Sequence, residues 1–90
     1  MTSGDTGIEF YWRPGCGFCM SLLAPLERSG LPFREFNIWE DPEAAATVRS
    51  VANGTETVPT VIVGSHAMVN PSFAEVEAAV REHAPGLLDD

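Results

Sequence analysis

The chain has 90 residues, of which 13 are acidic and five are basic, so its formal net charge is −8 at pH 7. All five basic residues are arginines, and such a surface lacks the positive footprint that nucleic acids and anionic membranes require. No apolar run approaches the roughly 20 residues that a transmembrane helix needs. The length allows one small domain, which we place at residues 7–84, between a disordered tail at 1–6 and a C-terminal tail at 85–90.

The first third of the chain predicts a β-α-β unit. Residues 8–12 are mainly β-branched and aromatic, which is typical of a strand. A helix is expected over about 17–29, with Pro25 inside it and Gly30 suited to its C-terminal cap. Residues 33–38 alternate apolar and polar side chains and predict a second strand. The two strands should be parallel, because the connection between them contains a helix.

The rest of the chain predicts a helix, a hairpin and a last helix. Asp41 suits an N-cap and Pro42 the first position of a helix that runs to Val51. Strands at 60–63 and 66–69, joined by the two-residue turn 64–65, should be antiparallel. Asn70-Pro71 is expected to open the last helix. The order β-α-β-α-β-β-α predicts an α/β fold of thioredoxin-like topology, with a four-stranded mixed sheet flanked by three helices.

The only two cysteines, Cys16 and Cys19, stand two residues apart where the first strand turns into the first helix. A C-x-x-C pair at this turn is the redox arrangement of thioredoxin-like proteins. The helix start presents free N–H groups and the positive end of the helix dipole to the first sulfur, which favours the nucleophilic thiolate. We therefore interpret Cys16 as the nucleophile and Cys19 as the resolving thiol. A structural disulfide is the alternative, but so short a loop would restrict the unfolded chain little.

Four further residues are candidates for substrate contact. Arg13 brings a positive charge near Cys16 and suits a substrate carboxylate, although a solvated loop arginine is the alternative. Phe18, between the cysteines, is poorly placed for burial. Val58-Pro59 stands directly before a strand, and together with the C-x-x-C pair it indicates a cis Val58–Pro59 bond. Such a bond would set the Val58 backbone beside the reactive sulfur. A cysteinyl peptide could then pair with the Val58 backbone groups.

No metal site is expected from the sequence. Zinc would need four ligands, and only His66 and His83 remain as nitrogen donors, neither at a metal-ligand spacing from the cysteines. The N-terminus has neither a basic start nor an apolar core, so we expect no signal peptide and a cytoplasmic location.

The strand-CGFC-helix unit, the Thr-Val-Pro-Thr-Val run at 57–61 and the element order resemble the glutaredoxin branch of the thioredoxin fold, over nearly the whole chain. Arg13 is similar to the basic residue that this family carries ahead of its active site. The runs at 37–41, 51–54 and 70–72 look most like mycoredoxins, the actinobacterial members. Phe10, expected to face inward, and Gly17-Phe18 between the cysteines argue against a true thioredoxin.

The resemblance implies a thiol–disulfide oxidoreductase with no bound cofactor. Members that use glutathione carry a Gly-Gly-x-Asp-like turn after the fourth strand, whereas residues 68–72 here read Met-Val-Asn-Pro-Ser. The resemblance therefore implies mycothiol, the sugar-linked thiol of actinobacteria, as co-substrate, and a monomer that reduces mixed disulfides between proteins and mycothiol. Two alternatives stay open. One is a dithiol redoxin reduced directly by thioredoxin reductase, and the other is a dimeric iron–sulfur carrier that uses Cys16 and a thiol cofactor from each protomer.

Overall fold

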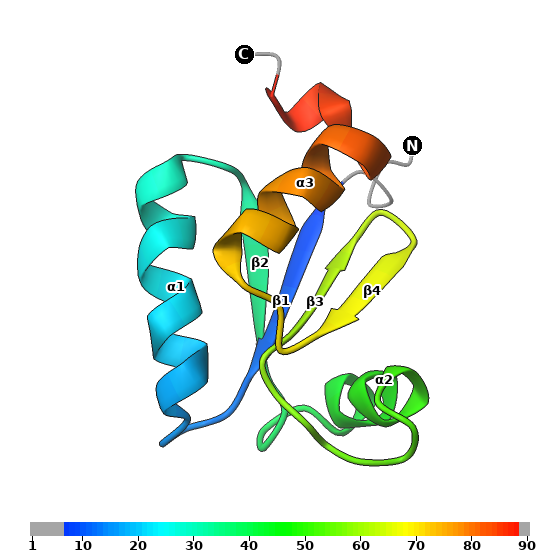
Figure 1. Cartoon of the computed structure of the whole chain (residues 1–90). Helices are drawn as coiled ribbons and strands as arrows, with labels where there is room; N and C mark the ends of the chain where they lie inside the picture. The colour runs from blue at the N-terminus through cyan, green and yellow to red at the C-terminus, as the bar shows by residue number, and fades with distance from the viewer. Residues whose placement is uncertain (1–6, 89–90) are drawn as a thin grey trace.

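A four-stranded mixed sheet lies at the centre of the computed structural model, which describes residues 7–88 (Figure 1). Its strands are β1 (Ile8–Trp12), β2 (Phe33–Asn37), β3 (Thr60–Val63) and β4 (His66–Val69), in the order β2-β1-β3-β4. β1 pairs in parallel with β2 and antiparallel with β3, and β3 pairs antiparallel with β4. The predicted thioredoxin-like topology is confirmed.

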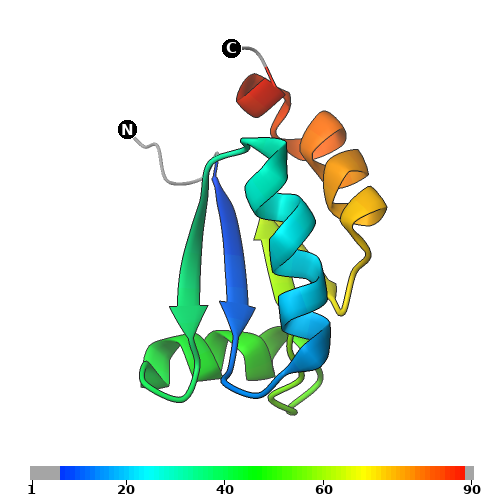
Figure 2. The same cartoon turned by 90° about the vertical axis from the view of Figure 1, so that its left-hand side faces the viewer.

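Helices cover both faces of the sheet. Helices α1 (Gly17–Ser29) and α3 (Phe73–His83) lie beside each other on one face, and α2 (Pro42–Val51) packs on the other (Figures 1 and 2). Gly30 ends α1 in the left-handed region at φ 77°, and the Asp41 carboxylate caps α2 by accepting two backbone N–H groups. Both caps are as predicted. No helix within residues 7–88 has the length and apolarity needed to cross a membrane.

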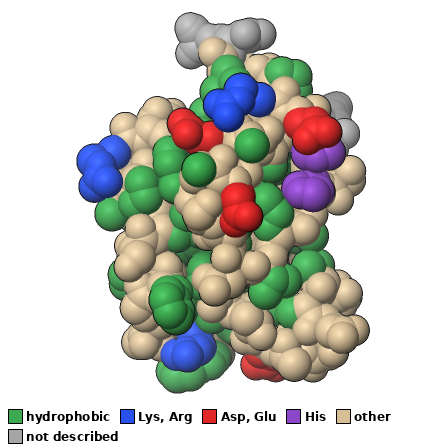
Figure 3. All heavy atoms as spheres, in the orientation of Figure 1, with side chains coloured by type: hydrophobic (Ala, Val, Ile, Leu, Met, Phe, Trp, Pro, Cys, Tyr) green, Lys and Arg blue, Asp and Glu red, His purple; other side chains and the backbone are tan. Residues whose placement is uncertain are grey.

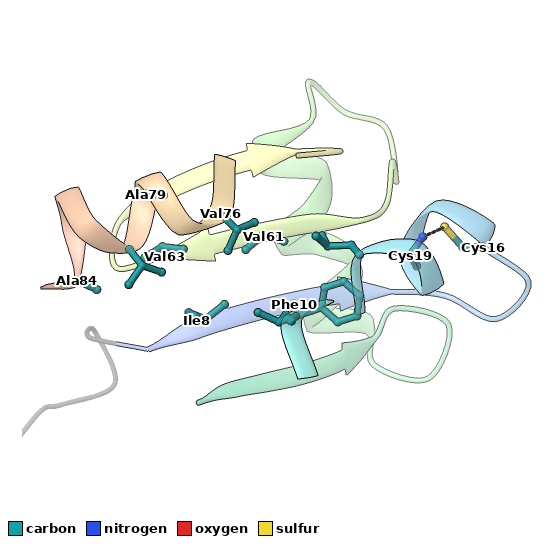
Figure 4. Packing of buried hydrophobic residues seen from close by; sticks show 12 residues of the cluster. Ile8, Phe10, Cys16, Cys19, Val61, Val63, Val76, Ala79 and Ala84 are labelled. Atoms are coloured by element: carbon teal, nitrogen blue, oxygen red, sulfur yellow. Dashed lines mark hydrogen bonds between the residues drawn. The ribbon is translucent and has the colours of Figure 1, made fainter. Parts of the chain in front are cut away.

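The main core lies between the sheet and the α1–α3 layer. Alternate strand residues, among them Ile8, Phe10 and Val61, point into it and are fully buried, and Figure 4 shows the two cysteines at one end of this cluster. Phe10 faces inward as expected. Tyr11 points the other way, into a smaller cluster beneath α2. The reactive end of the molecule is therefore continuous with the core that holds the fold together.

Two predicted boundaries are wrong. β2 ends at Asn37, one residue before the predicted end, because the Asn37 side chain accepts the N–H of Trp39 and begins a turn. α3 begins at Phe73 rather than at Asn70-Pro71. Its N-cap is Ser72, which forms a reciprocal capping box with Glu75 at 2.8 and 3.1 Å.

The structure describes part of the predicted C-terminal tail but none of the predicted N-terminal tail. Residues 1–6, expected to be a disordered tail, lie outside the described residues. Within the predicted C-terminal tail, Pro85–Leu88 forms a short 3-10 helix, η2, and Leu87 packs against the main core.

Candidate active site

Cys16 occupies the N-cap position of α1, with extended backbone angles of φ −96° and ψ 105°. Gly15 precedes it at φ 78°, a left-handed conformation that glycine adopts readily, so the chain reverses sharply into the helix. The Cys16 sulfur accepts the backbone N–H of Cys19 at 3.2 Å. Sulfur thus takes the place that an oxygen of Ser or Asp usually has at a helix start. A thiolate there receives a charge-assisted hydrogen bond.

The two thiols differ in accessibility. Cys16 retains 6% of its surface exposed, whereas Cys19 is fully buried in the main core (Figure 4). The pKa of the Cys19 thiol is raised well above its ordinary value of 9.0, mainly by burial and to a smaller extent by the hydrogen bond with Cys16. Both residues are free thiols in this structure. At neutral pH the inner sulfur is therefore a protonated thiol that incoming molecules cannot reach.

The loop between α2 and β3 brings a second backbone segment to Cys16. The Val58–Pro59 bond is cis, as predicted, and the Cys16 sulfur lies 3.8 Å from the Val58 carbonyl oxygen. Pro59 is buried, and its carbonyl accepts the N–H of Asn70 at 2.7 Å. The Thr60 hydroxyl donates to the Thr57 carbonyl at 2.8 Å. Hydrogen bonds on both sides thus hold this loop against the reactive sulfur.

A groove opens beside the first turn of α1. Phe18, with 71% of its surface exposed, forms one wall, and the loop between β4 and α3 forms the other. The groove has a volume of about 320 Å³ and is lined by seven side chains without formal charge: Phe18, Ser21, Leu22, Asn70, Pro71, Ser72 and Phe73. Hydroxyl and amide groups are therefore available there for neutral polar ligands, next to an exposed aromatic ring.

Arg13, in the loop between β1 and α1, lies against Trp39, in the loop between β2 and α2. The Arg13 guanidinium lies 5.8 Å from the centroid of the Trp39 ring, and its Nη1 donates to the Pro14 carbonyl at 3.1 Å. Trp39 was not predicted as a site residue. The available signal in the sequence is a large aromatic directly before Glu40-Asp41, and in the structure 64% of its surface is exposed.

The structure does not bring the histidines to the cysteines. His66 on β4 and His83 on α3 stack on each other, with ring centroids 4.5 Å apart. No group of three or more His, Cys, Asp or Glu residues within 7–88 could hold a metal ion.

The sequence matches the family model of the glutaredoxins over residues 8–68. It is 36% identical to mycoredoxin 1 of Corynebacterium glutamicum over 77 residues, which cover 83% of this chain and 94% of that protein. A probable glutaredoxin of Synechocystis is 39% identical over 56 residues, and the match spans 64% of that protein.

Solved structures give a consistent result. NrdH-redoxin from Escherichia coli, described as a glutaredoxin-like protein with a thioredoxin-like activity profile, superimposes with a TM-score of 0.60 and 32% identity. That match covers 73% of this chain and 82% of the other. A glutaredoxin from Archaeoglobus fulgidus superimposes with a TM-score of 0.71 over 84% of this chain and 87% of that one, at 22% identity.

Proposed function

The chain belongs to the glutaredoxin family of thiol–disulfide oxidoreductases, and we propose that it reduces mixed disulfides between protein cysteines and mycothiol. In this proposal Cys16 is the nucleophile, Cys19 is an auxiliary thiol, and the protein acts as a cytoplasmic monomer without a bound cofactor.

The observation that carries the proposal is the asymmetry of the two thiols. Cys16 sits at the helix start, accepts an N–H and keeps a solvent-exposed edge, whereas Cys19 is buried with a raised pKa. The thiolate is the attacking species in disulfide exchange, and attack needs access to the incoming sulfur. These conditions favour Cys16 as the first sulfur to react.

The reaction consists of two exchanges. The Cys16 thiolate attacks the mycothiol sulfur of the mixed disulfide, forms a disulfide with mycothiol, and releases the protein cysteine as a thiolate. A second mycothiol thiolate then attacks the disulfide on Cys16, which regenerates the Cys16 thiolate and releases mycothiol disulfide. In a side path, Cys19 loses its proton and attacks the same bond, which closes a Cys16–Cys19 disulfide and frees one mycothiol.

Neighbouring groups receive roles in substrate binding. The Val58 carbonyl oxygen lies 3.8 Å from the Cys16 sulfur. The Val58 backbone is proposed to pair with the backbone of a cysteinyl substrate. Pro59, through its cis bond, is proposed to hold the Val58 backbone in this position. The exposed ring of Phe18 is proposed to contact the substrate, and Arg13 to supply hydrogen-bond donors at the rim.

The neutral groove beside Phe18 supports mycothiol over glutathione. Glutathione carries an amino group and two carboxylates, and charged groups pay a desolvation penalty unless they are paired. The seven side chains of the groove offer no counter-charge for them. The 36% identity with mycoredoxin 1 of Corynebacterium glutamicum supports the same choice.

A second candidate function is a dithiol redoxin that receives electrons directly from thioredoxin reductase. The 32% identity with NrdH-redoxin, a glutaredoxin-like protein with a thioredoxin-like activity profile, favours this alternative. It requires both sulfurs in every turnover, because the reductase must reduce a Cys16–Cys19 disulfide.

Matched serine variants separate the two functions. With a mycothiolated peptide as substrate and mycothiol in excess, Cys19→Ser should keep turnover within about threefold of the wild type, and Cys16→Ser should have none. Release of the peptide thiol, followed by chromatography, measures both. Loss of turnover in Cys19→Ser would favour the dithiol redoxin, and turnover in Cys16→Ser would exclude Cys16 as the nucleophile.

A further inference from the structure

We propose that Trp39 and Arg13 form a subsite for the sugar part of the thiol co-substrate. The inference rests on the proposed function, since only a sugar-linked thiol presents such a group. It assigns a substrate-specificity role to Trp39, which lies in the loop between β2 and α2, outside the C-x-x-C turn and the Val58-Pro59 loop.

The Trp39 backbone is held in a defined position. The Asn37 side chain accepts the Trp39 N–H at 3.0 Å, and the neighbouring Ile38 N–H donates to the Trp12 carbonyl at 2.9 Å. One residue further on, the N–H of Glu40 donates to the Asn37 carbonyl at 3.0 Å. The bond from the Ile38 N–H to the Trp12 carbonyl ties this loop to the end of β1, from which the chain runs directly to Cys16. Trp39 and the reactive cysteine therefore lie at the same end of the sheet.

The Trp39 indole contacts Arg13 but remains largely exposed to solvent. Arg13 lies against the ring at 5.8 Å, yet 64% of the Trp39 surface remains exposed. The uncovered part of the ring is therefore open to contact with a ligand. At the lower end of the molecule, where β1 leads into α1, Figure 3 shows a basic side chain lying against hydrophobic ones.

The pair offers the two contacts that a sugar ring uses. The electron-rich face of an indole attracts the partly positive C–H groups on the face of a saturated ring. A guanidinium carries five N–H donors, and a single one of Arg13 is bonded within the described residues, to the Pro14 carbonyl. The remaining donors can bond ring hydroxyl groups. Glutathione has carboxylates that can pair with Arg13 but no such ring to place on the indole, so discrimination between the two thiols rests on Trp39.

The kinetic test uses one peptide carrying either mycothiol or cysteine as its disulfide partner. Trp39→Leu should raise KM for the mycothiolated peptide by about tenfold and leave KM for the cysteinylated peptide within about twofold of the wild type. Trp39→Phe, which keeps a smaller aromatic face, should lie between. Leu88→Ala, which truncates an exposed apolar side chain in η2, is the matched control and should change neither value.

A binding measurement independent of turnover uses the fluorescence of Trp39. In a Trp12→Phe/Cys16→Ser protein, Trp39 is the one remaining tryptophan and exchange is blocked. Titration with mycothiol should change its emission saturably, and cysteine should not. Trp39→Leu in the wild-type background should also leave the circular dichroism unchanged, which confirms that the fold is intact.

Other outcomes overturn the inference in distinguishable ways. If Trp39→Leu slows both peptides equally, Trp39 only supports the Arg13 loop. If it slows neither and mycothiol leaves the emission unchanged, the sugar binds elsewhere, such as in the groove beside Phe18. If the wild type itself does not prefer the mycothiolated peptide over the cysteinylated one, the proposed function fails, and the sugar subsite fails with it.

Discussion

The buried thiol of Cys19 should make the reduced protein lose stability in mild alkali. The pKa of Cys19 is raised above 9.0 in the folded protein by burial, whereas in the unfolded chain this thiol titrates at its ordinary value. Above pH 9 the unfolded state therefore binds fewer protons than the folded state. The contribution of Cys19 to stability is fully present below pH 9 and is lost as the pH rises towards the raised folded value.

The expected loss follows from the linkage relation. Each pH unit well above 9 removes about 1.4 kcal/mol for one such group, and integration across the titration gives a fall in the free energy of unfolding of about 1.4 kcal/mol between pH 8 and pH 10. Tyr11 adds a further loss above pH 10, because burial and the hydrogen bond to Glu9 raise its pKa as well. The chain has no lysine, so few other groups titrate in this range.

Urea denaturation of the fully reduced protein at pH 8 and pH 10 measures this effect, with Cys19→Ala as the matched variant. The free energy of unfolding of the variant should depend on pH less steeply, by about 1.4 kcal/mol over the interval. Equal pH dependence in the two proteins would refute the argument that burial keeps Cys19 protonated. The reductant must be present throughout, because a Cys16–Cys19 disulfide would remove the titrating thiol.

Three further substitutions test the packing that holds the site, each by urea denaturation. Ser72→Ala removes the capping box of α3 and should cost about 1 kcal/mol, whereas Ser21→Ala, on the exposed side of α1, should cost less than about 0.5 kcal/mol. Leu26→Ala empties a fully buried position and should cost about 2–5 kcal/mol, against less than about 0.5 kcal/mol for Leu88→Ala. Trp12→Phe should cost less than about 1.5 kcal/mol, because the buried indole Nε1 finds no acceptor within the described part of the chain.

The fold could be predicted because most of its signals are local. Four signals each indicate an element without reference to the rest of the chain: the β-branched and aromatic residues of β1, the alternation in β2, the Asp41-Pro42 start of α2 and the glycine at the end of α1. The start of α3 was predicted two residues too early. The Ser72-x-x-Glu75 spacing is itself a capping-box signature, but Asn70-Pro71 also suits a helix start, and only the reach of the Glu75 side chain decides between them.

The candidate site also combines features set by the local sequence with contacts between distant segments. The Cys16–Cys19 pair lies within one helical turn, so its geometry follows from the local sequence. The approach of Val58 to Cys16 joins two distant loops, and it is predicted only because Val58-Pro59 occurs together with the C-x-x-C pair. The contact of Arg13 with Trp39 could not be predicted from either residue, because it depends on how the loops after β1 and β2 leave the parallel strand pair.

In the proposed reaction, Cys16 takes the mycothiol from a mixed disulfide onto itself. The most direct measurement is the intact mass of the Cys19→Ser protein after reaction with a mycothiolated peptide in the absence of free mycothiol, followed by mapping of the modified residue. We expect a mass increase of one mycothiol, located on Cys16, with release of the peptide as a free thiol. An adduct that carries the peptide on Cys16, or a protein that gains no mass, would contradict it.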